Sequence, residues 1–368
     1  MLRTVLVRML RWLSPAPSRC RRLLPGDDEK ERDEHRQHHH GDDRPGNQPD
    51  PGTWPDTRSR APPRGSLSLP ALGVTPSLVV HHRQHSATPA DRRRIIASDD
   101  DLRSVVMKFG FVVPWADAEE VGDLAVVAEE CGWDGLFVWE PVWGVDAWIS
   151  LALAAVRTTK IRLGTMLTPP SRRRPWELAS QVATVDRLSG GRAVLSVGLG
   201  AVDSGFKAFG EVCDRRVRAE LMDECLEVMT GLWEGQPFKF DGRHYTVQPT
   251  DFPAIGHTVQ QPRVPVWCVG ALGHHRSMER AMRWDGLIPQ VIDGDGARQA
   301  SLEEIAGLRD LLGDAHYDVV IEGVGSEHSP AAWADAGATW WVESLWGAMS
   351  EASAVAAATD RLRDGPPS

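Results

Sequence analysis

The segment Gly132-Trp133-Asp134-Gly135-Leu136-Phe137-Val138-Trp139-Glu140 gives the first indication of how this chain of 368 residues folds. Its centre, residues 135–139, is an unbroken run of glycine and apolar residues, which is typical of a strand covered on both faces. Glu140 and Pro141 end the run. Because strands covered on both faces occur in parallel sheets flanked by helices, the segment predicts an α/β fold.

Seven more apolar runs continue this pattern toward both ends of the chain. They occupy residues 108–113, 161–168, 193–198, 264–269, 286–291, 318–323 and 339–343. Apolar residues at helical spacing lie between them, as at Val121, Leu124, Ala125 and Ala128. Eight strands alternating with helices over residues 107–368 predict a (β/α)8 TIM barrel. A doubly wound open sheet is the competing topology, but it usually has fewer strands.

The interval at residues 237–261 is too long for a simple connection. Alternating residues around Asp241-Gly242 predict a β-hairpin excursion between the fourth helix and the fifth strand. If the hairpin lies at the C-terminal face, it helps to build a substrate pocket and His244 belongs to that pocket. The alternative is a flap with no role in the site.

Residues 1–106 differ in composition from the rest of the chain. They contain 18 basic and 14 acidic residues and 12 of the 26 prolines, whereas the remainder has a net charge of −14. Since this segment shows almost no apolar periodicity, we expect a disordered N-terminal extension. Met107 directly precedes the first predicted strand, which suggests the hypothesis that translation starts there. The predicted organisation is an extension (1–106), a barrel (107–346) and a C-terminal helix and tail (347–368).

Composition and missing motifs exclude several classes of protein. No apolar run is long enough for a transmembrane helix, and arginines interrupt the first residues, so we expect neither membrane association nor secretion. Five cysteines without CxxC spacing predict a reduced, cytoplasmic protein with no metal site. The acidic barrel disfavours nucleic-acid binding. The sequence lacks the common hydrolase, metalloprotease and Walker motifs.

Candidate site residues follow the predicted strand ends, because catalysis in barrels occurs at that face. Gly270 and Gly273 precede a helix that starts near Arg276 and Ser277; they could hold a phosphate, or they could form only a turn. Two further groups have competing interpretations. Arg172, Arg173 and Arg174 either steer an anionic ligand or form a solvated run, and Trp115, Trp139, Trp143 and Trp148 either line a cavity or pack within the barrel, packing being favoured for Trp148.

Together these motifs resemble the bacterial luciferase-like family of flavin- and deazaflavin-dependent oxidoreductases. The similarity covers residues 107–346. It rests on the opening segment and on Met107-Lys108-Phe109-Gly110, Ile161-Arg162-Leu163-Gly164-Thr165, Pro175-Trp176-Glu177-Leu178-Ala179, Leu188-Ser189-Gly190-Gly191-Arg192, Val197-Gly198-Leu199-Gly200, Pro265-Val266-Trp267 and Arg283-Trp284-Asp285-Gly286.

The resemblance implies a flavin-type ring at the C-terminal mouth of the barrel. Residues 165–167 (Thr165, Met166, Leu167) would form a bulge behind the ring, with a non-proline cis peptide at Met166–Leu167. The phosphate would lie on Gly270, Gly273, Arg276 and Ser277. Glu140 and Gly200 would lie beside the cofactor. From their positions in the chain, we expect Trp115, Trp143, Arg174 and His244 to line the substrate pocket.

Two departures from the family pattern bear on the reaction. Deazaflavin-dependent sugar-phosphate and alcohol dehydrogenases of the family carry His after the acidic residue, where this chain has Pro141, and the sugar-phosphate enzymes carry an acid where it has Ala201. Without a group to accept the hydroxyl proton, we rank a monooxygenase first. It would use reduced FMN, molecular oxygen, a separate flavin reductase and a small, hydrophobic substrate, and act as a homodimer. The alternatives are a deazaflavin coenzyme with hydride transfer, and a non-catalytic flavin-binding barrel.

Overall fold

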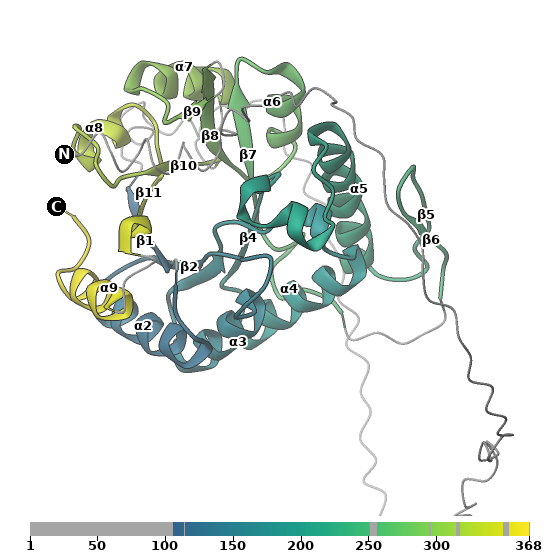
Figure 1. Cartoon of the computed structure of the whole chain (residues 1–368), viewed down its shortest axis with the longest axis horizontal. Coiled ribbons are helices and arrows are strands. Elements are labelled where there is room, and N and C mark those ends of the chain that lie inside the picture. Colours follow the sequence, from purple (N-terminus) through teal and green to yellow (C-terminus); the bar gives the residue numbers. More distant parts are fainter. Residues whose placement is uncertain are drawn as a thin grey trace, which may run out of the picture. The chain divides into compact units, whose positions relative to one another are not determined.

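Eight parallel strands close into a barrel in the computed structural model, which describes residues 106–113, 115–250, 256–293, 296–313, 317–348 and 353–367 (Figure 1). The barrel strands are β1 (Lys108–Val113), β2 (Gly135–Val138), β3 (Arg162–Thr165), β4 (Ala193–Val197), β7 (Val266–Leu272), β8 (Gly286–Asp293), β10 (Asp318–Glu322) and β11 (Trp340–Ser344). Pairing of β10 with β8 and of β11 with β1 completes the ring. The predicted TIM barrel is confirmed, whereas the predicted extension before Val106 lies outside the described residues.

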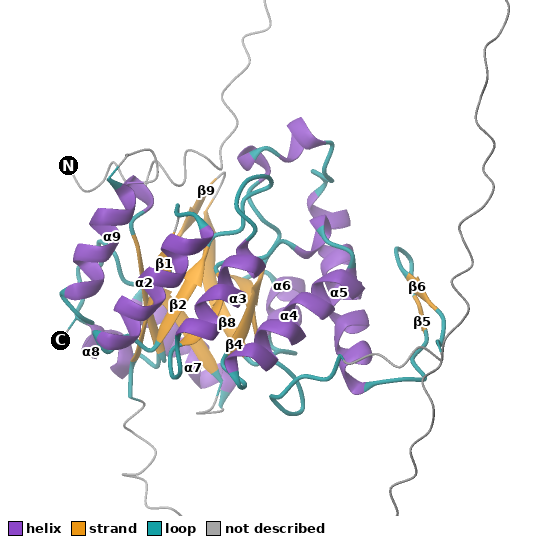
Figure 2. Ribbon diagram, turned by 90° about the horizontal axis from the view of Figure 1, so that it is seen from below, coloured by secondary structure: helices purple, strands orange, loops and turns teal. Residues whose placement is uncertain are grey.

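Eight helices surround these strands, one after each strand (Figure 2). They are α2 (Ala118–Glu130), α3 (Ala147–Arg157), α4 (Pro175–Ser189), α5 (Arg215–Glu234), α6 (His275–Ala281), α7 (Leu302–Leu312), α8 (Pro330–Asp335) and α9 (Ala354–Arg363). Asp117 and Ser301 begin α2 and α7 with capping boxes, and Gly190 ends α4 in a left-handed conformation. None of the helices in the described ranges is long and apolar enough to cross a membrane.

The last helix, α9, belongs to the barrel. The Trp133 indole donates a hydrogen bond to the carbonyl of Leu362 at 3.0 Å, and Arg361 lies over the Trp133 ring. Arg361 also binds both carboxylate oxygens of Glu343, at 2.7 and 2.9 Å. The helix predicted beyond Trp346 is therefore the eighth helix of the ring.

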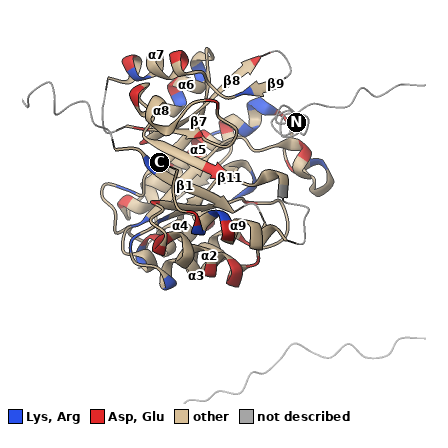
Figure 3. Cartoon of the chain, turned by 90° about the vertical axis from the view of Figure 1, so that its left-hand side faces the viewer, with Lys and Arg blue, Asp and Glu red and all other residues tan. Residues whose placement is uncertain are grey.

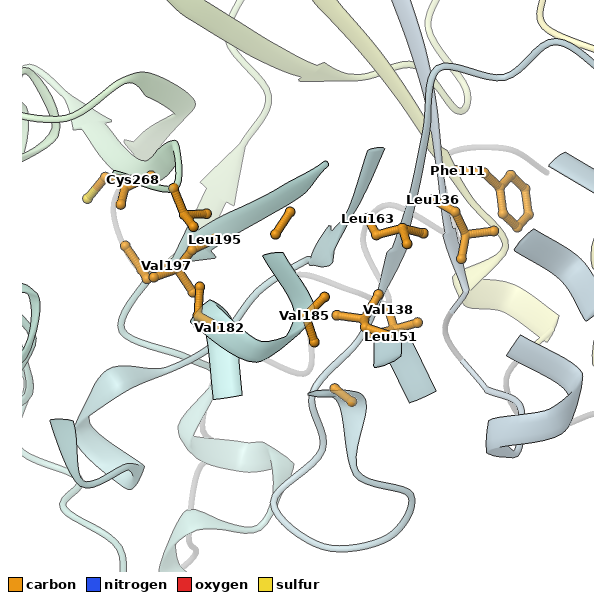
Figure 4. Packing of buried hydrophobic residues seen from close by; sticks show 14 of the residues in the cluster. Phe111, Leu136, Val138, Leu151, Leu163, Val182, Val185, Leu195, Val197 and Cys268 are labelled. Atoms are coloured by element: carbon orange, nitrogen blue, oxygen red, sulfur yellow. The ribbon is translucent and has the colours of Figure 1, made fainter. Parts of the chain in front are cut away.

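Apolar side chains fill the space between strands and helices (Figure 4). The charged residues lie mostly on the helices and loops (Figure 3). The barrel interior holds a second, smaller cluster. Phe137, Trp267 and Trp340 pack there with ring centroids 5.0–6.0 Å apart. Trp340 is the first residue of β11, and Trp267 pairs with Gly286, the first residue of β8. These rings therefore fill the N-terminal end of the barrel.

The predicted hairpin forms, but not where a substrate pocket requires it. Strands β5 (Phe240–Asp241) and β6 (Thr246–Val247) pair antiparallel, and the Glu224 carboxylate on α5 accepts the backbone N–H groups of Arg243, His244 and Tyr245. Figure 2 shows the hairpin outside the barrel, beside α5. Since a barrel helix runs back toward the N-terminal end of the strands, a segment inserted after it starts away from the mouth. The expectation of a hairpin over the C-terminal face is therefore wrong.

Strand β9 (Gly296–Arg298) was not expected from the sequence. It pairs antiparallel with the end of β8, through Val291 with Arg298 and Ile292 with Ala297. It extends the wall of the barrel mouth on the side of β8 and β10.

Candidate functional site

Alternation along the strands determines which side chains reach the mouth of the barrel. Val320 on β10 and Val342 on β11 belong to the interior cluster. Glu322 and Ser344 lie two residues further on, so they face the same interior one layer nearer the mouth. Their hydrogen bond, Ser344 Oγ to Glu322 Oε1 at 2.8 Å, confirms that the two side chains meet.

A cavity of about 200 Å³ lies in this layer. Its walls are mainly apolar, and its polar side chains come from β8, β9, β10 and β11 and the segments next to them. The lining residues are Val112, Met166, Leu167, Val269, Ile288, Pro289, Gln290, Ala297, Arg298, Gln299, Ala300, Val320, Ile321, Glu322, Val342, Ser344 and Trp346.

The segment after β3 forms one wall of the cavity as a bulge. The peptide bond between Met166 and Leu167 is cis, as predicted, and both side chains line the cavity. Gly198 at the end of β4 makes room for the bulge, because a Cβ atom there would lie 2.9 Å from Leu167 and 3.0 Å from Val269. A flat apolar ligand can therefore rest against Leu167.

Glu140 fixes the bulge from behind. Its Oε2 accepts a hydrogen bond from Thr168 Oγ1 at 2.6 Å, and Thr168 Oγ1 lies 2.9 Å from Thr165 Oγ1. Its Oε1 accepts hydrogen bonds from Arg172 at 3.2 Å and Arg173 at 3.0 Å. Because two arginines and a threonine occupy this buried carboxylate, Glu140 acts as a positioning residue and is not among the residues that line the cavity.

Arg172 of this network and Arg218 on α5 also hold the loop after β4. The guanidinium groups of Arg172 and Arg218 lie 5.3 and 5.7 Å from the centroid of the Phe206 ring. Arg218 donates to the carbonyls of Leu199 and Gly200 at 2.6 and 2.9 Å. Burial lowers the pKa of both arginines. Arg172 and Arg173 are thus not a solvated charge run.

Glu322 is the acidic group at the mouth that the sequence analysis missed. It is half-buried at the C-terminal end of β10, where it borders the cavity. Burial raises its pKa, and hydrogen bonds from Ser344 and Trp346 oppose that shift only in part. None of the ion pairs among the described residues involves Glu322. A carboxyl group without a cation is easiest to bury in its protonated form.

The sequence does contain a weak signal for Glu322. In the run Asp318-Val319-Val320-Ile321-Glu322, the acidic residue occupies the same face as Val320, at the C-terminal end of a strand. An acidic residue at an inward position of a barrel strand indicates a functional group.

The predicted phosphate-binding residues are only partly brought together. Gly270 packs against β8, because a Cβ atom there would lie 2.3 Å from Leu287. The Ser277 hydroxyl accepts the backbone N–H of Ala271 at 3.0 Å, and Arg276 is exposed. Gly273 lines a separate groove between β7, α6 and α7, where Glu304 is the charged residue. Phosphate binding here stays a prediction.

The predicted substrate-pocket residues lie outside the cavity. Trp115 and Trp143 are 60% and 80% exposed. Arg174 is exposed and pairs with Glu177, and His244 lies beside α5 with its Nε2 3.1 Å from Glu220. Within the described ranges, moreover, there is no cluster of His, Cys, Asp and Glu suited to a metal ion.

Gly200 has a conformational role in the structure. Its φ of 73° is left-handed, and a Cβ atom would lie 2.9 Å from both Phe206 and Pro169. It therefore lets the chain turn tightly after β4.

Comparison with known proteins gives the class. The chain belongs to the luciferase-like monooxygenase family, whose model matches residues 103–314. An uncharacterized protein of Mycobacterium tuberculosis is 32% identical over 229 residues, covering 59% of this chain and 75% of that protein.

Two similar proteins have named activities. The chain is 39% identical over 149 residues to an F420-dependent glucose-6-phosphate dehydrogenase of Nocardia farcinica, which covers 35% of this chain and 44% of the enzyme. It is 31% identical over 137 residues to a 5,10-methylenetetrahydromethanopterin reductase of Archaeoglobus fulgidus, which covers 37% of this chain and 40% of that enzyme. The chain thus spans less than half of each of these enzymes.

One solved structure supports the fold. It is an F420-dependent secondary alcohol dehydrogenase in complex with an F420–acetone adduct, with a TM-score of 0.52 and 17% identity over 70% of this chain and 97% of that one. The family and the barrel define this protein as a luciferase-like oxidoreductase with a flavin-type cofactor.

Proposed function

We propose that this protein is a deazaflavin-dependent oxidoreductase that catalyses hydride transfer with a small organic substrate. The cavity of about 200 Å³ beside Met166 and Leu167, with its mainly apolar walls, supports a bound flavin-type ring, and the F420-dependent dehydrogenase among the relatives supports deazaflavin. Ligand sites for drug-sized molecules usually measure about 300–1,000 Å³. The cavity therefore suits a flat ring, while the tail of the coenzyme must lie outside it.

The described residues fit a flavin-type ring. Leu167 and Val269 offer apolar surface, and Gly198 leaves the space that the bulge needs. Gln290 and Glu322 can exchange hydrogen bonds with a polar ring edge. When bound, the coenzyme supplies the hydride chemistry; the protein's own residues orient the reactants and exclude water.

The choice of deazaflavin over FMN reverses the order derived from the sequence. The two named relatives above are a dehydrogenase and a reductase, and the dehydrogenase is described as F420-dependent. The sequence-based objection was the absence of a group that accepts the hydroxyl proton of an alcohol. That objection concerns only the oxidation of an alcohol, so it does not exclude hydride transfer in the reductive direction.

A reduced-FMN monooxygenase is the second candidate. It is favoured by the name of the matched family and by the apolar cavity, since protection of a reactive flavin–oxygen species requires a dry pocket. This candidate requires molecular oxygen and a source of reduced flavin, such as a separate reductase.

A titration of the full chain with oxidised coenzyme F420 and with FMN, followed by fluorescence, separates the candidates. The proposal expects saturable binding of F420 and coenzyme reduction or oxidation without oxygen uptake across a panel of alcohols and ketones. Binding of FMN alone, with substrate-dependent oxygen consumption in the presence of a flavin reductase, would favour the monooxygenase. Binding without turnover would favour a carrier barrel.

We also propose a homodimer that forms through the outer face of α3. Ile149 and Val156 on this face are 65% and 60% exposed, and the charged residue of the helix, Arg157, lies at its last position. Trp143 precedes the helix and is also exposed. An exposed apolar helix face of this kind is typical of an interface. A second copy of the chain would present the same face, as two-fold symmetry requires.

Light scattering on the full chain tests this assembly. Ile149→Asp should convert a dimer to a monomer at micromolar concentration. Leu311→Asp, a change at an equally exposed apolar residue of α7, should leave the dimer intact. A monomeric wild type, or equal effects of both substitutions, would contradict the proposed interface.

A further inference from the structure

Glu322 combines three properties that few acidic side chains share. It occupies an inward position at the end of a barrel strand, it borders the cavity, and its described partners are neutral. By contrast, Glu343 on the neighbouring strand faces outward, where Arg361 binds both of its carboxylate oxygens. Burial next to a cavity without a cation is costly unless a ligand uses the group.

The charged surroundings of Glu322 leave its carboxyl group uncompensated. Arg298 on β9 also borders the cavity, but its guanidinium binds both oxygens of Glu304, each at 2.8 Å, and Asp293 at 3.2 Å. On β10 itself, Asp318 lies at the other end of the strand, where it accepts from Trp267 and Thr339. The remaining polar neighbours are neutral: Gln290 on β8, Gln299, Ser344 and Trp346.

The backbone around Glu322 is held firmly, so the carboxyl group has a defined place. The Gln299 amide donates to the Glu322 carbonyl at 2.6 Å. Ser344 Oγ donates to Glu322 Oε1 at 2.8 Å, and Trp346 also hydrogen-bonds the carboxyl group. A carboxyl group has about four lone-pair sites, so these two partners leave capacity for a ligand. A protonated carboxyl group can donate one hydrogen bond and accept another at the same time.

We propose that Glu322 binds the flavin-type ring in its protonated form, donating a hydrogen bond to a ring carbonyl oxygen. This inference rests on the proposed function, but it does not depend on the choice between FMN and deazaflavin, because both rings carry the same uracil-like edge of alternating carbonyl and N–H groups. An ionised Glu322 has no proton to donate and repels the carbonyl oxygen. Proton uptake by Glu322 therefore accompanies ring binding.

The proposal predicts a specific pH dependence. Below the raised pKa of Glu322 the group is already protonated, and the dissociation constant should be flat. Above that pKa the constant should rise about tenfold per pH unit, because each binding event must take up one proton. Ser344→Ala removes a hydrogen bond that favours the carboxylate. The pH at which the dissociation constant begins to rise should therefore be higher in this variant.

The test is a fluorescence titration of the full chain with FMN and with oxidised F420 from pH 5 to pH 9. Glu322→Gln keeps a neutral donor and acceptor, so it should bind about as tightly as the wild type at low pH. Its dissociation constant should not show the rise with pH that deprotonation of Glu322 causes in the wild type. Since both proteins meet the same ligand, the difference between their profiles cancels ionisation of the ligand itself. Glu322→Ala should bind roughly tenfold more weakly at low pH, as expected for the loss of one neutral hydrogen bond to the ring.

Three outcomes would overturn the inference, and they are distinguishable. If the wild type binds neither ring, the proposed function fails together with this inference. If it binds a ring but its profile matches that of Glu322→Gln, only the role of Glu322 fails. If Glu322→Gln loses binding at every pH while circular dichroism shows an intact fold, the carboxylate rather than the carboxylic acid is required.

Discussion

Two glutamates at the mouth of the barrel, Glu140 and Glu322, have different surroundings, and we expect them to have different roles for that reason. Glu140 follows β2 and is buried against Arg172, Arg173 and Thr168, so its charge is neutralised and its oxygens are occupied. Glu322 ends β10 and faces the cavity with neutral partners. The first glutamate holds the wall of the site, and the second remains available to a ligand.

This difference follows from where the cations lie. The run Arg172-Arg173-Arg174 comes after the β3 bulge, within reach of Glu140, and two of its three arginines fold inward. On the side of the mouth where Glu322 lies, Arg298 borders the cavity, but it forms ion pairs with Glu304 and Asp293. A carboxyl group at the cavity without a cation is a candidate functional group, whereas one between two arginines is a structural anchor.

The largest effect is expected from removing the anchor. Glu140→Ala leaves Arg172, whose side chain is 6% exposed, without its carboxylate partner. Breaking a buried ion pair in this way should lower the free energy of unfolding by about 3–5 kcal/mol. Urea denaturation followed by circular dichroism measures the change, and a loss below about 1 kcal/mol would show that Glu140 does not hold the bulge.

A change at Gly198 should affect ligand binding more than stability. The Cβ atom of Gly198→Ala would lie within 3.0 Å of Leu167 and Val269, so the wall of the cavity must shift. We expect ring binding to weaken about tenfold, or about 1.4 kcal/mol, because the Leu167 and Val269 side chains that must move line the cavity. Gly307→Ala on α7, where a Cβ atom meets no other atom within 4 Å, is the matched control and should bind normally.

Glu322→Gln should stabilise the protein in a pH-dependent manner. Because burial raises the pKa of Glu322 in the folded state, the wild type loses stability as pH rises from the unfolded pKa through the folded one. The substitution removes that loss. Its melting temperature should therefore exceed that of the wild type by more at pH 8 than at pH 4.5, and an equal difference at both values would contradict the assigned burial.

The smallest effect is expected at the exposed end of the arginine run. Arg174 and Glu177 are 3.5 Å apart with side chains 71% and 59% exposed. Arg174→Ala should change the free energy of unfolding by less than about 0.5 kcal/mol and leave ring binding unaltered. A large loss of binding would instead support the sequence-based placement of Arg174 in the substrate pocket.

Local patterns predicted the barrel because they determine strands and helices directly. Apolar runs such as residues 135–139 and glycine at a helix end such as Gly190 depend on near neighbours in the chain. The cis bond at Met166–Leu167 came from the family resemblance and is present. The excursion around Asp241-Gly242 was recognised as a hairpin, but its location depends on the direction of the preceding helix.

The division between the two glutamates could not be predicted in this way. Arg172 and Arg173 reach Glu140 across 32 and 33 residues of sequence, and Ser344 reaches Glu322 across 22. Such contacts exist only once the barrel has closed. Trp115 and Trp143 illustrate the same limit, since their positions near strand ends suggested a lining role and yet their side chains lie mostly in solvent.

A crystal structure of the full chain with oxidised F420 tests the central claim most directly. We expect the ring in the cavity, with one face against Leu167 and the uracil-like edge within hydrogen-bond distance of Glu322. Glu140 should keep its hydrogen bonds from Arg172 and Arg173. A ring bound outside the barrel, or one whose polar edge meets Glu140 instead of Glu322, would contradict it.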